Sequence, residues 1–166
     1  MQKKALILVL AAFVGIVGWY LFRPERLFIN QSVSETLPSS AANVAAVAEP
    51  VVVSMGAFHK GSHETKGTAT IYQYPNGKRV LRLTGFETSN GPDVQLYLVA
   101  ANDATDNETV TKAGFVHLGA LKGNVGDQNY DVPADVDLST HRAVTVWCRR
   151  FGVNFGTAPL STPANS

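Results

Sequence analysis

The sequence predicts an all-β fold, an antiparallel β-sandwich or barrel-like domain, behind a single N-terminal transmembrane helix. Three observations predict it. The chain opens with an apolar run, Ala5–Phe22, that contains no charge and no proline. From Val51 onward, short runs with strand-like alternation are separated by Gly, Asn and Pro. After residue 30 no segment has a sustained helical period, so we expect strands and turns in the rest of the chain.

The apolar run is long enough to cross most of a bilayer core, because about 18 helical residues at 1.5 Å each span about 27 Å. Lys3 and Lys4 precede the run, and Trp19 and Tyr20 lie near its far end, where aromatic rings prefer the interface. A cleaved signal peptide, the alternative, has a shorter apolar region followed closely by small residues. We therefore expect an uncleaved single-pass anchor in the cell membrane, with the C-terminal domain extracytoplasmic.

The chain divides into four parts by composition. We expect an N-terminal membrane anchor over residues 1–26 with its helix at 5–22, a tether over 27–50, a β domain over 51–161 and a tail over 162–166. The tether is rich in small and polar residues and shows no sustained period, which is typical of a spacer between a membrane and a domain.

Within the β domain, several short runs are predicted as strands. The stretch Pro75-Asn76-Gly77-Lys78 is a strong turn signal, because Asn and Gly accept the positive φ angles of a tight turn, and it predicts a hairpin. Pro133 limits the strand before it to a short or edge position. The predicted strands cover residues 67–74, 79–86, 94–99, 115–121, 130–132, 144–148 and 151–155.

Charge and cysteine content exclude several classes of function. Residues 27–166 are nearly neutral, so the domain has no electrostatic footprint for nucleic acid. A single Cys excludes an internal disulfide, and an exported domain must then be held together by its core. The sequence has no nucleophile elbow, no His-Glu-x-x-His motif and no dinucleotide fingerprint, so hydrolase signals are absent.

The one cysteine lies in the aromatic stretch VTVWCRRFGVNFG, residues 144–156. Strand alternation places Val144, Val146 and Cys148 on one face and Trp147 on the other. On this basis Cys148 is a small buried hydrophobe, as free Cys often is. The strand break that follows leaves a second interpretation open, in which Cys148 reaches a rim or pocket and the two following arginines favour its thiolate.

Two further positions are candidates for a site. Asp93 follows Asn90-Gly91-Pro92 directly before a strand, where it either caps a turn or places a carboxylate at the rim of the fold. His63 is one of four His that could bind a metal or haem iron together with Cys148, but their spacings match no metal motif. A haem or metal cofactor is compatible with the sequence and is not required by it.

Taken in order, several short pieces of the chain resemble the DM-thirteen domain, the small β domain found beside DOMON domains in animal extracellular proteins and alone behind membrane anchors in bacteria. The resemblance extends over roughly 110 residues, and the ordered set is far more specific than any single piece. The matching pieces are His63 with Gly67–Ile71, Leu81–Phe86, Asn90–Asp93, Leu96–Leu98, Leu118–Asn124, Gln128–Pro133, Val146–Phe151 and Phe155–Gly156.

The resemblance implies a role in electron transfer. The family's Trp-Cys signature corresponds to Trp147 and Cys148, and the roles suggested for that Cys are a redox-active thiol or a ligand to a prosthetic group such as haem. We therefore predict a membrane-tethered redox module with Cys148, Trp147 and Asp93 at its reactive site, and with Cys148 and His63 as cofactor ligands. Its partner would be a redox or envelope protein. The alternative is a non-catalytic envelope β-sandwich that binds a protein or a glycan.

Overall fold

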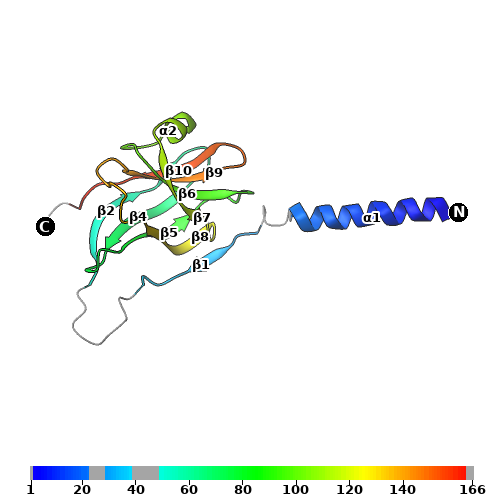
Figure 1. Cartoon of the computed structure of the whole chain (residues 1–166), viewed down its shortest axis with the longest axis horizontal. Helices are drawn as coiled ribbons and strands as arrows, with labels where there is room; N and C mark the ends of the chain where they lie inside the picture. Colours follow the sequence, from blue (N-terminus) through cyan, green and yellow to red (C-terminus); the bar gives the residue numbers. More distant parts are fainter. Residues whose placement is uncertain (1, 23–28, 39–48, 164–166) are drawn as a thin grey trace.

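The computed structural model of the chain describes residues 2–22, 29–38 and 49–163. It begins with helix α1 (Gln2–Phe22), which lies apart from the β domain (Figure 1). A stretch of α1, Lys3–Tyr20, has a mean hydropathy of 1.7 and is not buried, so it is long and apolar enough to cross a membrane. A signal sequence near an N-terminus has the same properties. The end of the predicted anchor at 23–26, the tether at 27–28 and 39–48, and the tail at 164–166 lie outside the described residues.

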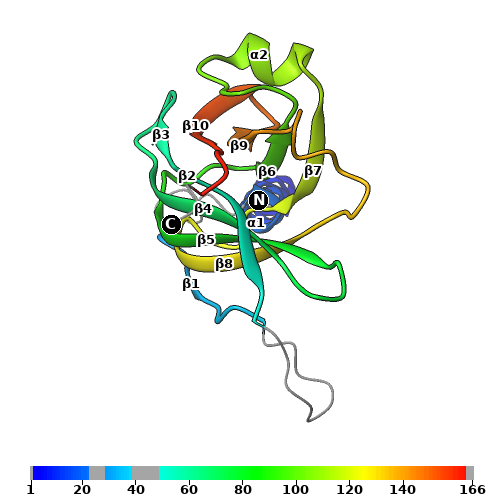
Figure 2. The ribbon, with the colours of Figure 1, turned by 90° about the vertical axis from the view of Figure 1, so that its left-hand side faces the viewer.

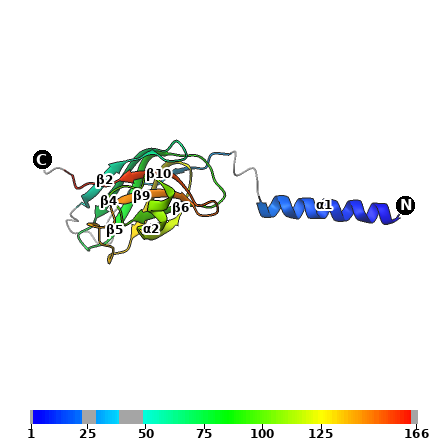
Figure 3. The same ribbon diagram turned by 90° about the horizontal axis from the view of Figure 1, so that it is seen from above.

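The β domain consists of two five-stranded sheets, seen as two layers in Figure 2 and from above in Figure 3. Among the described strands every pairing is antiparallel except that of β1 with β8, which is parallel. Both sheets have open edges, so the fold is a sandwich and not a closed barrel, and the predicted sandwich is confirmed. The first sheet has the order β1 (Ser32–Ser34), β8 (Val125–Val132), β5 (Arg79–Glu87), β4 (Lys66–Gln73) and β2 (Val51–Ala57). The second has the order β3 (His59–Lys60), β10 (Val153–Pro159), β9 (Ala143–Cys148), β6 (Val94–Val99) and β7 (Phe115–Ala120).

The main core lies between the sheets and follows the predicted alternation. β9 contributes Val144, Val146 and Cys148, all of them fully buried. Burying an apolar side chain of the size of Val or Leu contributes about 1.5–3 kcal/mol, so a cluster of this extent can hold the domain together without a disulfide. Other fully or nearly fully buried members are Leu81, Leu83 and Phe86 of β5 and Leu96 and Leu98 of β6.

A short helix that the sequence did not predict covers the outer face of the second sheet. α2 (Asn107–Lys112) begins after Asp106, whose carboxylate accepts a backbone N–H of the first turn at 2.7 Å and caps the helix. Its Val110 is buried in a second apolar cluster with Trp147 and Tyr97. The expectation of no helix beyond residue 30 is therefore wrong, because six helical residues are too few to display a period of 3.6.

Part of the predicted tether is a strand. β1 lies along the first residues of β8, and the Gln31 N–H donates to Asn124 Oδ1 at 2.7 Å. Gly126 has a φ of +101°, and a side chain at this position would collide with the Val33 carbonyl. These residues are thus attached to the edge of the sheet. Composition could not indicate this attachment, because the partner of Gln31 lies 93 residues away in the sequence.

The other predicted strands are present with shifted ends. β8 begins at Val125 instead of Tyr130, and it ends before Pro133 as expected. β10 begins at Val153, because residues 149–152 form the turn of the β9–β10 hairpin. β2 and the two-residue β3 precede the first run that was predicted as a strand.

Glu35 carries the main electrostatic contact of the β1 segment. Lys122 Nζ lies 2.8 and 3.0 Å from its two carboxylate oxygens, and the Asn129 N–H donates to it at 2.7 Å. Burial raises the pKa of Glu35, but the Lys122 ammonium and the Asn129 N–H lower it by more, so the pKa lies below its usual 4.5. A carboxyl group with a lowered pKa in the folded state stabilises that state above its unfolded pKa, and the contribution is lost as the pH falls through the folded pKa.

We predict that acid weakens the attachment of β1 while the sandwich stays folded. The protection of the Ser32–Glu35 amides against hydrogen exchange should fall as the pH drops below 4.5, the usual pKa of the group. At pH 7, Glu35→Gln should lower this protection by about 0.5–1 kcal/mol, since both partners are partly exposed. Glu64→Gln is the matched control, because Glu64 lies 4.0 Å from Lys60 Nζ in an exposed pair. An equal loss of β1 protection in the two variants would contradict the assignment.

Candidate functional site

Several connections between strands meet at one end of the sandwich, which we call the signature end. In the first sheet Lys66 pairs with Glu87, and Glu87 pairs with Val125. In the second sheet Val94 pairs with Cys148. These registers bring together the connections at residues 61–65, 88–93, 121–124 and 149–152. The positions predicted from the sequence as site residues all lie at or beside this end, namely Cys148, Trp147, Asp93 and His63.

A chain of buried hydrogen bonds closes the signature end. The Thr65 and Thr88 hydroxyl oxygens are 2.9 Å apart, and the Thr65 hydroxyl donates to the Phe155 carbonyl at 3.2 Å. The Thr88 N–H donates to the Asn124 carbonyl at 2.9 Å, and the Asn124 side-chain amide donates to the Thr88 carbonyl at 3.0 Å. Thr65, Thr88 and Asn124 are buried. The connections from both sheets are therefore joined by polar groups that satisfy one another.

Cys148 is the last residue of β9, and its side chain lies in the main core. Its exposed fraction is 0%, and its cross-strand neighbours are Val94 and Val153. The cluster to which it belongs is hydrophobic, so the sulfur is enclosed. In this closed arrangement Cys148 acts as a packing residue, and any reaction at its sulfur requires the surrounding connections to open.

Phe155 of β10 is the part of this core that contacts the other predicted residues. It belongs to the same cluster as Cys148. The half-buried His63 ring lies 4.0 Å from the Phe155 ring, centroid to centroid. Gly91 approaches the same ring so closely that an added Cβ would lie 3.0 Å from Phe155 Cζ. His63 is thus placed as a packing partner of Phe155, and residue 91 must be small for its loop to close over the ring.

Asp93 is the centre of a polar chain at the signature end. Its carboxylate accepts hydrogen bonds from Arg149 Nε at 2.9 Å and from Gln95 Nε2 at 2.6 Å. The side-chain oxygen of Gln95 lies 2.8 Å from His117 Nε2. The charge of the Asp93 carboxylate is balanced by Arg149. The same carboxylate also positions the buried amide of Gln95. We call Arg149, Asp93, Gln95 and His117 the Asp93 chain.

Trp147 lies on the outer face of the second sheet, opposite the face that carries Cys148. It is nearly buried in the cluster beneath α2, and its ring centroid lies 6.5 Å from that of Tyr97. Tyr97 stacks on Phe115 at 4.1 Å, and the edge of its ring meets His117 at 5.5 Å. The adjacent Trp and Cys of the sequence are therefore separated by the sheet, as the alternation predicted, and Trp147 lies on the same face as its cross-strand neighbour Gln95.

Sequence reasoning missed Gln95. In the run VQLYLV it is the one polar residue, and alternation places it with Tyr97 on the face away from Leu96. A polar side chain in a buried strand needs hydrogen-bond partners, so its presence indicates a polar contact nearby. The partners themselves follow only from the strand register, which sets the residues of β7 beside those of β6.

The residues around Cys148 do not fit a haem or a metal ion. A thiolate ligand needs further ligands and room for the group, whereas the Cys148 side chain is fully enclosed in a hydrophobic cluster. The described part of the chain contains no group of three or more His, Cys, Asp or Glu that could hold a metal ion. The predicted pairing of Cys148 with His63 as cofactor ligands gains no support from this arrangement, and we derive no step through such a group.

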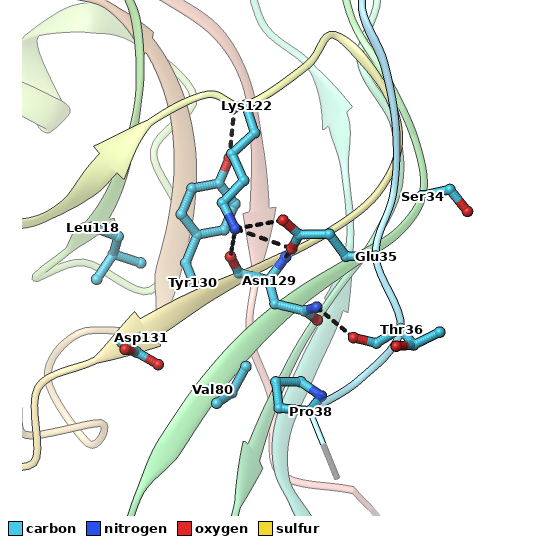
Figure 4. Close-up of a pocket in the computed structure, with 10 residues that line it drawn as sticks. All are labelled: Ser34, Glu35, Thr36, Pro38, Val80, Leu118, Lys122, Asn129, Tyr130 and Asp131. Atoms are coloured by element: carbon cyan, nitrogen blue, oxygen red, sulfur yellow. Dashed lines mark hydrogen bonds and ion pairs between the residues drawn. The ribbon is translucent and has the colours of Figure 1, made fainter.

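A groove of about 710 Å³ lies away from these residues, beside the β1 segment and the end of β8 (Figure 4). The Lys122 ammonium projects into it, bonds to Glu35 and to the Asn129 carbonyl, and lies 5.2 Å from the centroid of the Tyr130 ring. Burial raises the pKa of Tyr130 well above its usual value, so its hydroxyl stays protonated. None of the four predicted site residues lines this groove, and its central cation is paired within the chain.

We predict unequal costs for two substitutions in the Asp93 chain. Asp93→Ala should lower the free energy of unfolding by about 1–3 kcal/mol, because the buried Gln95 amide loses its acceptor. Arg149→Gln should lower it by no more than about 1 kcal/mol, because the ion pair is open to solvent on the Arg149 side, whose side chain is 61% exposed. Denaturant unfolding of both variants measures the difference. Equal costs would mean that the ion pair, and not the bond to Gln95, is the stabilising contact.

The comparisons with known proteins concern the same part of the chain. No curated protein and no solved structure matches it. A family model described as electron transfer DM13 matches residues 57–160, which is more than half of the chain and includes all four predicted site residues and the Asp93 chain. The match begins at the end of β2 and does not include β1. The resemblance expected from the sequence is confirmed, and the chain belongs to the DM13 electron-transfer domain family.

Proposed function

We propose that this chain is a membrane-tethered extracytoplasmic domain with a role in electron transfer, and that Cys148 is its redox-active group. The observation that carries the proposal is the match to the DM13 electron-transfer family over residues 57–160. The convergence of the predicted positions on the signature end supports it, because residues far apart in the sequence are brought to one place. Asp93 and Trp147 act as positioning residues, since Asp93 holds the 149–152 turn through Arg149 and Trp147 packs on the face of β9 opposite the sulfur.

The proposal includes the organisation predicted from the sequence. Residues 1–26 form an uncleaved single-pass anchor in the cell membrane, residues 27–50 connect it to the β domain at 51–161, and residues 162–166 form a short tail. The exposed, apolar helix α1 supports the anchor. The attached β1 segment means that the connection is held partly against the domain. The domain has the nearly neutral charge of a protein that does not bind nucleic acid.

The chemistry available to Cys148 is thiol–disulfide exchange with a partner protein. The Cys148 thiol gives its proton to solvent, and the thiolate attacks one sulfur of a disulfide in the partner. A new S–S bond forms between Cys148 and that sulfur, while the other partner sulfur leaves as a thiolate. Cys148 is the one Cys of the sequence, so a thiol of the partner must resolve the mixed disulfide and regenerate Cys148. A partner thiol other than the one that left attacks the partner sulfur of the mixed disulfide, forms a new disulfide with it and releases Cys148 as a thiolate. One partner thiol is thereby oxidised and another is reduced, and Cys148 returns to its starting state.

The enclosed sulfur makes opening of the signature end a necessary step. The 90–93 connection packs on Phe155 through Gly91, and the 149–152 turn is held to Asp93 through Arg149. Both are surface connections, and such segments open at a lower free energy than the sheets they join. Their opening would expose the end of β9 without separating the two sheets.

A non-catalytic binding domain is the second candidate, and the 0% exposure of Cys148 favours it. Phe115 is 44% exposed and stacks on Tyr97, which supplies a flat aromatic surface for a protein or glycan partner. In this case Cys148 serves stability, and Phe115→Ala would abolish binding while a Cys148 substitution would leave it unchanged.

We predict that Cys148 in the folded full-length protein reacts faster than global unfolding allows. The chain in detergent micelles is treated with a small alkylating reagent at low, non-denaturing urea concentrations. Hydrogen exchange of the Val144–Val146 amides in β9 reports global unfolding. If the signature end opens locally, the alkylation rate should be at least about tenfold higher than global unfolding permits, and it should depend little on urea. A small protein that contains a disulfide bond should form a mixed disulfide with the native chain, and the rate of this reaction should show the same weak dependence on urea.

The Cys148→Ala variant is the control for this measurement, because it removes the thiol without burying an unpaired hydroxyl in the apolar cluster, and it must give neither alkylation nor a mixed disulfide. A thiol that reacts only at the rate of global unfolding, together with no mixed disulfide, would leave Cys148 as a packing residue and favour the binding domain. A visible chromophore in the purified protein would contradict the thiol chemistry and would favour electron transfer through a bound cofactor.

A further inference from the structure

We propose that the signature end faces the membrane, and that the tip of the β9–β10 hairpin, Arg149–Gly152, rests on anionic lipid headgroups with Phe151 as its apolar contact. This inference rests on the anchor assigned under the proposed function. It adds the orientation of the domain and the surface that it contacts. It also places any redox partner of Cys148 in or directly at the membrane.

The chain enters the β domain at the signature end, close to the end of α1 in the sequence. The segment before β1 is attached at the signature end, where the Asn90 side chain donates to the Ile29 carbonyl at 3.1 Å and the Asn124 side chain donates to Asn30 Oδ1 at 2.9 Å. α1 ends at Phe22, and the few residues between Phe22 and Ile29 can span at most about 25 Å. In Figure 1 β1 reaches the sandwich from the side on which α1 lies.

The length of the sandwich determines which of its two ends lies nearer to the end of α1. The turn at Tyr74–Lys78 lies at the opposite end, one full strand away, because β5 runs from Arg79 beside this turn to Glu87 at the signature end. The nine residues of this strand span about 27 Å from end to end, close to the greatest distance that the connection to α1 can cover. The signature end is therefore held within about 25 Å of the end of the helix, whereas the far end reaches the same surface only when the connection is almost fully extended.

β1 is fitted to its place by two glycines. A side chain at Gly126 would collide with the Val33 carbonyl, and a side chain at Gly123 would collide with the Gln31 carbonyl. Asn124 between them bonds to both Asn30 and Gln31. The attachment is therefore built into the edge of the sheet, and it holds the segment from Asn30 to Ser34 in a fixed position on the domain.

The surface at this end has the chemistry that a headgroup layer accepts. Phe151 is 68% exposed at the tip of the hairpin, and Ile29 is 59% exposed on the segment that leads to the anchor. Two exposed arginines directly precede Phe151; Arg149 is paired with Asp93 within the chain, and cationic side chains near an anionic leaflet are attracted to its headgroups. An apolar ring beside cationic side chains is typical of segments that rest in the interface. The contact can be weak, because the anchor keeps its effective concentration in the millimolar range.

The test uses the full-length chain in nanodiscs that contain anionic lipid and a small fraction of lipid with a gadolinium-chelating headgroup. Paramagnetic broadening of the backbone amides then reports the distance of each residue from the headgroups. We expect residues 150–152 to be broadened several-fold more than residues 76–78. Phe151→Ser should reduce this contrast. Val51→Ser is the matched control and should leave it unchanged, since Val51 is 61% exposed and pairs with Gln73 at the far end.

A second variant keeps the test informative even if Phe151→Ser disturbs the hairpin. About twelve Gly and Ser residues inserted between positions 28 and 29 lengthen the connection and leave the sandwich untouched. This insertion should also reduce the contrast between the two ends. Equal broadening of both ends in the unmodified chain, or stronger broadening of residues 76–78, would overturn the orientation.

Flotation with lipid vesicles separates this inference from the assignment on which it rests. A chain that does not float would overturn both the anchor and the orientation. A chain that floats but shows equal broadening at both ends would overturn the orientation alone. The reactivity of Cys148 is measured in detergent and stands independently of either result.

Discussion

Every side chain of β9 is buried, and this constraint sets what the rest of the domain must provide. Its inward residues need an opposing sheet, and its outward residues need a second cover. α2 and the chain before it supply that cover, and polar contacts fix their path: the Thr145 and Thr157 hydroxyls are 3.0 Å apart, and Thr157 donates to the Ala104 carbonyl at 2.9 Å. An unpaired polar group here would cost about 1–3 kcal/mol, so the loop is positioned by hydrogen bonds as well as by packing.

The parts of the fold that were predictable are those encoded by local alternation. The facing of Cys148 and Trp147 to opposite sides of β9 follows from a period of two, and the Pro75–Lys78 turn follows from its residue types. Contacts across the chain were not predictable in this way. The pairing of β1 with β8 and the contact of Gln95 with His117 could not be predicted, because the register between two distant strands cannot be inferred from the sequence of either strand alone. The enclosure of Cys148 likewise depends on loops from both sheets.

Several residues of the matched region serve the closure of the signature end. Gly91 makes room for the Phe155 ring, and Gly156 makes room for the buried Thr65. Asn124 joins the end of β5 to the start of β8 through Thr88 and also holds the segment before β1. The sulfur of Cys148 lies beneath these contacts, so substitutions that expose it must weaken the closure. Under the proposed function, reactivity and stability are opposed at the signature end, because the contacts that enclose the sulfur also hold the connections in place.

The connection between α1 and the sandwich has two possible lengths, a short one while β1 is attached to β8 and a longer one when β1 is released. While β1 is attached, residues 23–28 alone separate α1 from the domain surface; once it is released, the connection extends to Val51, where β2 begins. For a flexible chain the mean span would rise from about 13 Å to about 30 Å. The volume that the domain can sweep would grow about tenfold, since it scales with the cube of this span. The family match begins at residue 57, so β1, the strand whose release lengthens the connection, lies outside it.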